Sequence, residues 1–177
     1  MEGADSWYDD SHLNSQEKKH CAGEWWFTSA LHALRYLECR KVGKLAQKAW
    51  NRTEQLMAAG KLTPKTGVNG AGDAFRHCFW SALITLALDR GRAEGYGNRH
   101  EYGNTPPTNR QKREHFYDMR KMDLHNNGVG RDLASRHGAN EAKVEQACIY
   151  ECRQGGRLWV LYRIWGGRRH DYSEPHS

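Results

Sequence analysis

Two segments of this chain place polar side chains where a helix usually carries packing residues. Each set follows the spacing i, i+3, i+4, i+7, which falls on one face of two helical turns. The first set is Asp73, Arg76, His77 and Trp80, and the second is Asp123, Asn126, Asn127 and Gly130. Because apolar residues flank both sets, they indicate a buried pocket rather than a solvated surface, and they predict two helices whose polar faces meet.

The segment 73–89 has the strongest helical pattern in the chain. Apolar side chains occupy most of its sides, which is typical of a central, buried helix. Further helical patterns cover 15–23, 24–59, 108–136 and 139–153. Residues 158–164 are rich in β-branched and aromatic side chains and predict a strand or hairpin arm. The sequence therefore predicts a mainly α fold: a single-domain helical bundle around a buried central helix at about 73–89, with a small C-terminal β element.

Two of these segments contain glycines that could interrupt a helix. The segment 24–59 is either two helices or one helix bent at Gly43. The segment 91–101 predicts only a short helix, broken at Gly95 and Gly97, because glycine is a poor helix former.

A capping box at Thr108–Gln111 predicts the start of the next helix. Its end has two interpretations. Asparagine competes for backbone hydrogen bonds, so Asn126-Asn127 followed by Gly128 could stop the helix. Alternatively, the helix continues through Gly130 to Arg136, which keeps the second polar set on one face.

The length of 177 residues suits one domain with a self-sufficient core. Residues 1–14 are polar and predict a flexible N-terminus. Residues 15–166 carry the helical patterns and make up the predicted domain. Residues 167–177 predict a loose C-terminal tail.

The charge of the chain favours anionic partners. Its net charge is +6 at pH 7 and its isoelectric point is near 9.1. Nucleic acid, phospholipid headgroups, cell-wall polymers or an acidic protein would be attracted to such a surface, although solubility alone also explains the charge. Since no Lys/Arg run exceeds two residues, a dedicated basic arm is absent.

The cysteines do not predict a disulfide framework. There are five of them, an odd number, and they are scattered along the chain. Cys148 and Cys152 lie four residues apart on an expected helix, where reduced packing side chains are the better interpretation.

Neither a membrane span nor a leader is evident. No apolar run approaches the ~20 residues needed to cross a bilayer. The segment Met1–Asp5 is acidic and lacks the apolar core of a secretory signal. We therefore expect synthesis in the cytoplasm without a signal peptide, and export would need a secretion machine.

The first polar set has a structural and a chemical interpretation. Asp73 follows a glycine-rich loop and could be a helix N-cap, with Arg76 facing water. His77 lies one turn deeper among aromatic residues, where a histidine is either a hydrogen-bonded core residue or a ligand or base. His100 and Glu101 can reach one site together only at a helix end or in a loop, because neighbouring helical residues point about 100° apart.

The second polar set suggests how the two helices would meet. Gly130 would allow close approach of another helix, and contact with bulky Trp80 would align the two polar faces. The side chains that would then converge are Asp73, His77, Asp123 and Asn127.

Such a convergence suits metal-assisted hydrolysis. Asp, Glu and His side chains bind divalent cations such as Zn²⁺, Mn²⁺ or Mg²⁺, which activate water. Without a metal, the same groups would act as general acid and base. The predicted metal ligands are His77, His100, Glu101 and Asp123. The full predicted catalytic set is Asp73, Arg76, His77, His100, Glu101, Asp123, Asn126 and Asn127. No glycine-rich phosphate loop, HExxH, nucleophile elbow or CxxC motif supports nucleotide-driven or redox chemistry.

These residues also carry a resemblance to a known family. The motifs are Asn-x-x-x-Asp-Ala-Phe-Arg-His-x-x-Trp over 69–80, His-Glu at 100–101, Met-Asp-Leu-His-Asn-Asn-x-x-Gly-Arg over 122–131, and Gly-Gly-Arg-Leu over 155–158. Over about residues 13–164 the chain resembles an uncharacterised bacterial domain of polymorphic toxins and contact-dependent secretion cargo. Cys78 and Phe79 replace the Ala and Tyr that are usual in that family.

The resemblance implies an antibacterial effector that a secretion system delivers into a target cell, with a cognate acidic immunity protein as partner. We expect a hydrolase whose first substrate class is a phosphodiester, in nucleic acid or phospholipid, ahead of peptidoglycan or its lipid-linked precursor. Two alternatives stay open. The aromatic segments 25–27 and 159–165 could serve a non-enzymatic binding or membrane-perturbing effector, and the polar sets could be a buried network that fixes helix packing.

Overall fold

A computed structural model describes residues 14–22, 29–62, 70–161 and 172–173 of the chain. The helices are α2 (Ser15–Ala22), α3 (Ser29–Ala58), α4 (Ala71–Ala87), α5 (Arg90–Tyr102), α6 (Arg110–His137) and α7 (Glu141–Tyr150), which continues into the π-helical turn η2 (Glu151–Gly155). Two short strands follow, β1 (Val160–Leu161) and β2 (Tyr172–Ser173). The predicted mainly α, single-domain fold is confirmed.

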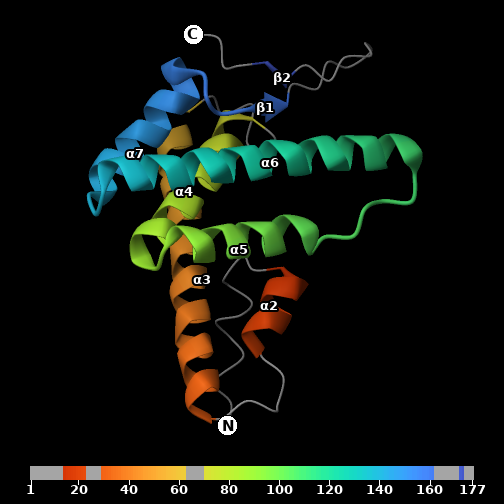
Figure 1. The fold of residues 1–177 in the computed structure, drawn as a ribbon. Helices are drawn as coiled ribbons and strands as arrows, with labels where there is room; N and C mark the ends of the chain where they lie inside the picture. Colours follow the sequence, from red (N-terminus) through yellow and green to blue (C-terminus); the bar gives the residue numbers. More distant parts are fainter. Residues whose placement is uncertain (1–13, 23–28, 63–69, 162–171, 174–177) are drawn as a thin grey trace.

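Helix α4 is the buried centre of the bundle, as predicted. It contacts α3, α5, α6 and α7, and Figure 1 shows it passing behind α6. From Gly72 to Ile84 every residue except Arg76 is buried. The helix begins at Ala71, so Asp73 lies in its first turn and the N-cap interpretation of Asp73 is wrong.

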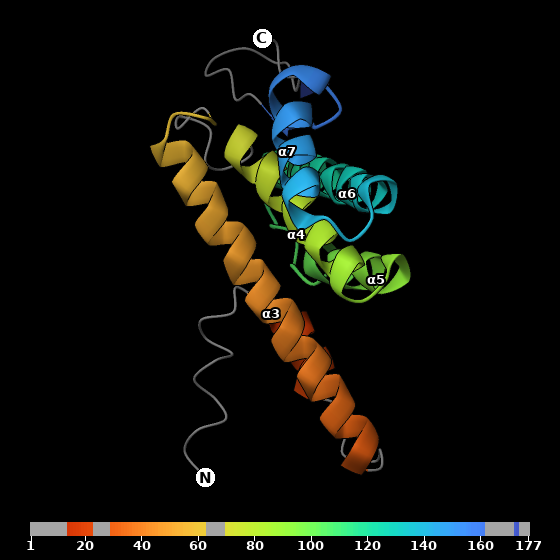
Figure 2. The same ribbon diagram turned by 90° about the vertical axis from the view of Figure 1, so that its left-hand side faces the viewer.

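Helix α3 is a single helix of 30 residues that includes Gly43. Figure 2 shows it as a long rod whose N-terminal half extends beyond α4–α7, with α2 beside that half. The two-helix alternative for this part of the chain is therefore wrong.

Helix α5 runs without interruption through Gly95 and Gly97, so the predicted break is wrong. Asp89 starts it by accepting the Arg92 backbone N–H at 2.7 Å. A Cβ atom on Gly97 would lie 3.2 Å from Asn127 Nδ2 of α6. The glycine therefore permits close packing of α5 on α6, and this tertiary contact outweighs its poor helix propensity.

Helix α6 follows the longer of the two predicted courses and ends at His137. Its cap is Asn109, whose side chain accepts the Lys112 N–H at 3.1 Å, so the helix starts one residue later than the capping box at Thr108 implied. Beyond its end, Gly138 has a φ of 61°, which favours glycine.

Helices α4 and α6 pack closely at Gly130. A Cβ atom there would lie 2.0 Å from the Cys78 carbonyl oxygen. The predicted close approach is present, but its partner is the backbone at Cys78 rather than the side chain of Trp80.

One disulfide joins Cys21 of α2 to Cys39 of α3, so the expectation of no disulfide is wrong. The pairing depends on a fold that brings two helices together across 18 residues, which scattered cysteines do not reveal. Cys148 and Cys152 are free and buried, as expected, and Cys148 Sγ lies 2.7 Å from Cys78 Sγ.

The C-terminal β element is a two-stranded antiparallel ladder, in which Val160 pairs with Ser173 and Leu161 with Tyr172. Residues 172–173 were part of the predicted loose tail, and this pairing corrects that prediction for them. The predictions for 1–13, the aromatic residues 25–27, Asn69 and the rest of the tail lie outside the described residues. None of the described helices has the length and apolarity needed to cross a membrane.

Candidate metal centre

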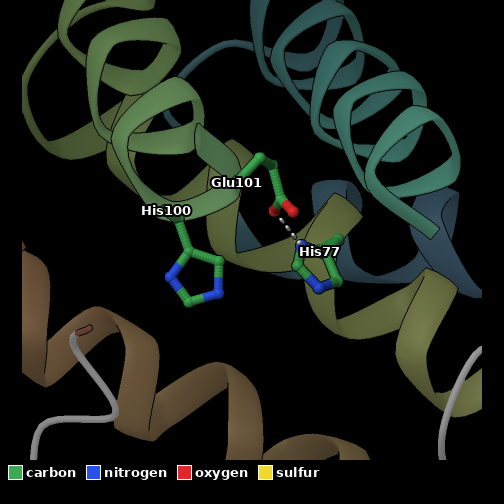
Figure 3. A group of neighbouring side chains, drawn as sticks. All are labelled: His77, His100 and Glu101. Atoms are coloured by element: carbon green, nitrogen blue, oxygen red, sulfur yellow. Dashed lines mark ion pairs between the residues drawn. The ribbon is translucent and has the colours of Figure 1, made fainter. Parts of the chain in front are cut away.

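Three helices bring carboxylates to one imidazole. The Nε2 atom of His77 (α4) lies 3.5 Å from Asp123 Oδ1 (α6) and 3.6 Å from Asp73 Oδ1, one turn earlier on α4. The Nδ1 atom of His77 lies 3.5 Å from Glu101 Oε1 (α5). Figure 3 shows the Glu101 carboxylate pointing at His77, with the ring of His100 beside it.

The close helix packing described above makes this convergence possible. Gly130 sets α6 against the backbone of α4, and Gly97 lets α5 approach Asn127 of α6. His100 and Glu101 lie in the last turn of α5, which ends at Tyr102. Both side chains can therefore reach the same site from adjacent positions.

Several polar atoms of the cluster are buried without a hydrogen-bond partner in the described part of the chain. They are His77 Nδ1, Glu101 Oε1, Asp123 Oδ1, and both Nδ2 and Oδ1 of Asn127. Such an atom usually costs about 1–3 kcal/mol, so buried polar groups are nearly always bonded. A cluster of these atoms indicates a site built to receive an ion or a polar ligand.

Burial controls the protonation of these groups. Burial lowers the pKa of His77 well below 6.5, and the charges of Arg76 and His100 lower it further. Burial raises the pKa of Glu101 to about 7, although the charge of His100 opposes the rise. Burial, together with the charges of Glu101 and Asp73, raises the pKa of Asp123 well above 3.8. The neutral imidazole is the form that binds metals, and a cation would favour the ionised carboxylates.

His100 is the more exposed of the two histidines, with 26 % of its side chain accessible. Its Nδ1 atom lies 2.9 Å from Oε2 of Glu17, on helix α2. Burial lowers the pKa of His100, but the hydrogen bond and charge of Glu17 outweigh it and the pKa is raised overall. The ring also meets the indole of Trp80 edge-on, with centroids 5.2 Å apart.

Arg76 brings a permanent positive charge to the edge of the cluster. Its Nη2 atom bonds Asp73 Oδ1 and lies 3.3 Å from His77 Nε2. The guanidinium stacks over the ring of Trp50 at 5.1 Å. Arg76 thus neutralises part of the carboxylate charge on the Nε2 side of His77.

A cavity of about 210 Å³ adjoins the cluster. Its walls come from α3, α4 and α5: Ala46, Trp50, Arg76, His77, Trp80 and His100. Both histidines and the guanidinium therefore border a space that a small anionic or polar group can enter.

Two overlapping triads have ligand atoms within 4.8 Å of one another: His77, His100 and Glu101, and Asp73, His77 and Asp123. In the triad of Asp73, His77 and Asp123, Arg76 already forms an ion pair with Asp73, and its positive charge would repel a metal cation there. In the two-histidine triad, no arginine of the described residues bonds the Glu101 carboxylate, and two of its rings line the cavity. Asp123, predicted as a ligand, lies on the other side of the His77 ring, next to Nε2.

The structure separates Asn126 from the rest of the predicted set. Its Nδ2 atom donates to the Trp159 carbonyl at 3.0 Å, and its Oδ1 atom accepts the Trp159 N–H at 2.8 Å. Asn126 therefore holds the C-terminal segment against α6. The other seven predicted residues all belong to the cluster around His77 or to the wall of its cavity.

Sequence reasoning missed Glu17 and Trp50. Asn14-x-x-Glu17 is a recognisable helix-start pattern, but nothing in it points to His100 across 83 residues. Trp50 has helical spacing typical of packing, and only the structure shows Arg76 above its ring.

Comparison with known proteins gives a family but no activity. The family described as "Domain of unknown function (DUF6973)" matches residues 29–156. The chain belongs to this family. The match extends from the start of α3 to the end of η2, so it includes every predicted site residue and excludes Glu17. No curated protein and no solved structure matches the chain. The expected membership of an uncharacterised family is confirmed.

Proposed function

We propose that this protein is a metal-assisted hydrolase whose cation is held by His77, His100 and Glu101. The observation that carries the proposal is the group of buried polar atoms around His77 that lack a hydrogen bond within the described residues, beside a cavity with an arginine at its edge. A purely structural network would be expected to satisfy its own hydrogen bonds. Here the pairs His77 Nδ1–Glu101 Oε1 and His77 Nε2–Asp123 Oδ1 are each 3.5 Å apart, longer than a normal hydrogen bond.

The donor set favours a borderline cation. Two imidazoles and one carboxylate suit Zn²⁺ or Mn²⁺ better than Mg²⁺, which prefers oxygen ligands. Three protein ligands leave a coordination position open for water or substrate. When bound, such a cation lowers the pKa of water and supplies a nucleophile at neutral pH.

The chain's own residues have distinct roles in this proposal. In the metal-bound form, Asp73 and Asp123 would accept a proton from His77 Nε2 in place of the Arg76 Nη2 contact at 3.3 Å, which leaves Nδ1 as the ligand atom. Asp123, whose pKa is raised by burial, would exchange a proton with His77 Nε2, because it lies on the side of the ring away from the proposed cation. Arg76, at the cavity wall, would bind an anionic substrate, and Asn127 would position it.

A phosphodiester is the substrate class that these features favour. The net charge of +6 attracts polyanions, and Arg76 offers a guanidinium in the wall of the same cavity as His77 and His100. Nucleic acid and phospholipid are therefore the first substrates to test, and peptidoglycan or its lipid-linked precursor comes second. We further propose, from the family resemblance alone, that the protein is an antibacterial toxin delivered by a secretion system and bound by an acidic immunity protein.

Metal content and hydrolysis by matched variants test the proposal. Purified protein should contain about one Zn or Mn per chain by mass spectrometry, and it should cleave one member of a panel of RNA, DNA and phospholipid vesicles. His77→Ala and His100→Ala should lose both properties. His137→Ala, which changes an exposed histidine of α6, should keep both.

A folded His77→Ala protein with full activity would refute the catalytic proposal. Expression in the cytosol and in the periplasm of a bacterium would separate the substrate classes, because nucleic acid is cleaved only from the cytosolic side. Leakage of dye from liposomes that survives Glu101→Ala and Asp123→Ala would instead favour a membrane-perturbing effector. Within the described residues, Trp159 of the aromatic C-terminal segment stacks on His125 at 3.9 Å, so this indole is already used in internal packing.

A further inference from the structure

Glu17 touches the candidate centre from a helix that lies outside the matched family range. Its side chain is fully buried, which is rare for a glutamate unless it is paired. The Oε2 atom meets two groups: the Asn14 backbone N–H at 2.7 Å and His100 Nδ1 at 2.9 Å. Glu17 therefore links the start of α2 to a residue that borders the cavity.

Helix α2 is held against the end of α5 by several contacts. Asn14 Oδ1 accepts the backbone N–H of Glu17, which completes a reciprocal cap. Asn14 Nδ2 donates to the carbonyl of His100 at 2.7 Å and to that of Arg99 at 3.3 Å. A Cβ atom on Gly103 would lie 2.8 Å from Asn14 Nδ2, so the glycine is needed for this approach.

The contact between Glu17 and His100 decides which nitrogen of the His100 ring carries the proton. A carboxylate is an acceptor, so His100 Nδ1 must be the donor. The neutral ring then carries its proton on Nδ1 and has its lone pair on Nε2. Figure 3 shows one nitrogen of His100 turned toward His77 and the other turned away.

We propose that Glu17 is a positioning residue for the metal centre: it fixes His100 in the Nδ1–H tautomer and leaves Nε2 available as a ligand. The inference rests on the ligand role given to His100 above. Carboxylate–histidine–metal arrangements of this kind typically change metal affinity about 10–100-fold when the carboxylate is lost. Glu17, which lies outside the residues matched by the family, would thus belong to the candidate metal centre of this chain.

The competing explanation is that Glu17 serves only as the capping residue of α2. A glutamine at this position keeps both the cap and an oxygen acceptor for His100 Nδ1. A methionine has a similar size but accepts neither hydrogen bond well. The pair Glu17→Gln and Glu17→Met therefore tests the acceptor, and Glu114→Met, an exposed glutamate paired with Arg110, controls for the substitution itself.

The first measurement is the tautomer of His100, read from the ¹⁵N shifts of its ring in metal-free protein at alkaline pH. The wild type and Glu17→Gln should show the Nδ1–H form, which an unrestrained imidazole disfavours. Glu17→Met should revert to the Nε2–H form. An Nε2–H tautomer in the wild type would overturn the inference, whether or not the protein binds metal.

The second measurement is the affinity for Zn²⁺ or Co²⁺ by titration of metal-free protein. Glu17→Met should bind about 10–100-fold more weakly, Glu17→Gln within a few-fold of the wild type, and Glu114→Met equally well. Equal affinity in folded Glu17→Met and wild type would reject the positioning role. If the wild type binds no metal while His100 still shows the Nδ1–H form, the proposed function fails and the contact has only a structural role.

Discussion

The two nitrogens of His77 meet different partners, and this division organises the whole cluster. Nε2 faces Asp73 and Asp123, while Nδ1 faces Glu101. With an exposed side-chain fraction of only 5 %, the ring has little contact with bulk water that could replace either set. Because all three carboxylates contact the same imidazole, removing any one of them changes the environment of His77.

Asp123→Asn distinguishes chemistry from packing at this position. The substitution keeps the shape and an acceptor oxygen, and it removes a carboxyl group whose ionised form burial disfavours. The metal-free variant should melt at the same temperature as the wild type or higher, while hydrolysis falls about 10²–10⁴-fold because a proton carrier is lost. Calorimetry and rate assays check both. A lower melting temperature with unchanged hydrolysis would support the packing-network alternative instead.

The buried carboxyl group of Glu101 should make the stability of the metal-free protein depend on pH. Its pKa rises from 4.5 to about 7 on folding because the carboxyl group is buried. Protonated Glu101 is therefore favoured in the folded state, and its contribution to stability is complete below pH 4.5 and lost as pH rises to 7. The loss should be on the order of 1–3 kcal/mol. Urea unfolding with chelator between pH 5 and 8 measures it, and Glu101→Gln should flatten this part of the profile.

Among the elements, α4 and α6 show most directly how backbone packing creates the site. Gly128 and Gly130 lie two residues apart on α6, yet only Gly130 faces the α4 backbone. A Cβ atom on Gly128 would meet only the end of the Arg131 side chain, at 3.8 Å.

The two alanine substitutions at these glycines should have opposite effects. Gly130→Ala should destabilise the protein by about 1–3 kcal/mol or more, because its Cβ atom would overlap the Cys78 carbonyl. Gly128→Ala should stabilise it by about 0.5–1 kcal/mol through helix propensity alone. Denaturant midpoints give both values. Equal effects at the two sites would contradict the described crossing of the helices.

The disulfide between α2 and α3 gives a second prediction for an element. It closes a segment with a sequence separation of 18 residues, for which chain entropy predicts a stabilisation of about 3 kcal/mol. A reductant should lower the melting temperature of the wild type and have little effect on the double variant Cys21→Ser/Cys39→Ser. If reductant left the melting temperature of the wild type unchanged, the disulfide would be absent or would not stabilise the protein.

At the scale of the whole molecule, the candidate centre joins α4, α5 and α6 and is contacted by α2 and α3. A cation bound by His77, His100 and Glu101 would link α4 to α5 and favour the folded state over the unfolded chain. Metal at 100 times its dissociation constant should add about 2.7 kcal/mol to the free energy of unfolding.

Thermal shifts should therefore depend on metal and on the ligands. Zn²⁺ or Mn²⁺ should raise the melting temperature of the chelator-treated wild type and of Gly128→Ala. The same addition should have little effect on Glu101→Gln and His100→Ala. A shift that persists in both ligand variants would place the cation elsewhere in the protein.

Local and periodic features were predictable from the sequence because they depend on neighbouring residues. The apolar pattern of 73–89 determined that α4 would be central, and the spacing of the polar sets determined that His77 and Asp123 would share facing helices. Several errors arose where a distant contact outweighs a local preference. Gly97 stays helical because Asn127 packs against it, and Cys21 is oxidised because α3 brings Cys39 within reach.

The sequence by itself determined the helical fold class and the residue types of the candidate site, since helical periodicity and side-chain chemistry are local properties. Only the tertiary structure decided which groups meet. It turned Asn126 toward Trp159 and away from His77, placed Asp123 at Nε2 and not at Nδ1, and brought Glu17 to His100. These pairings depend on the distances at which whole helices pack, and no spacing along the chain encodes such a distance.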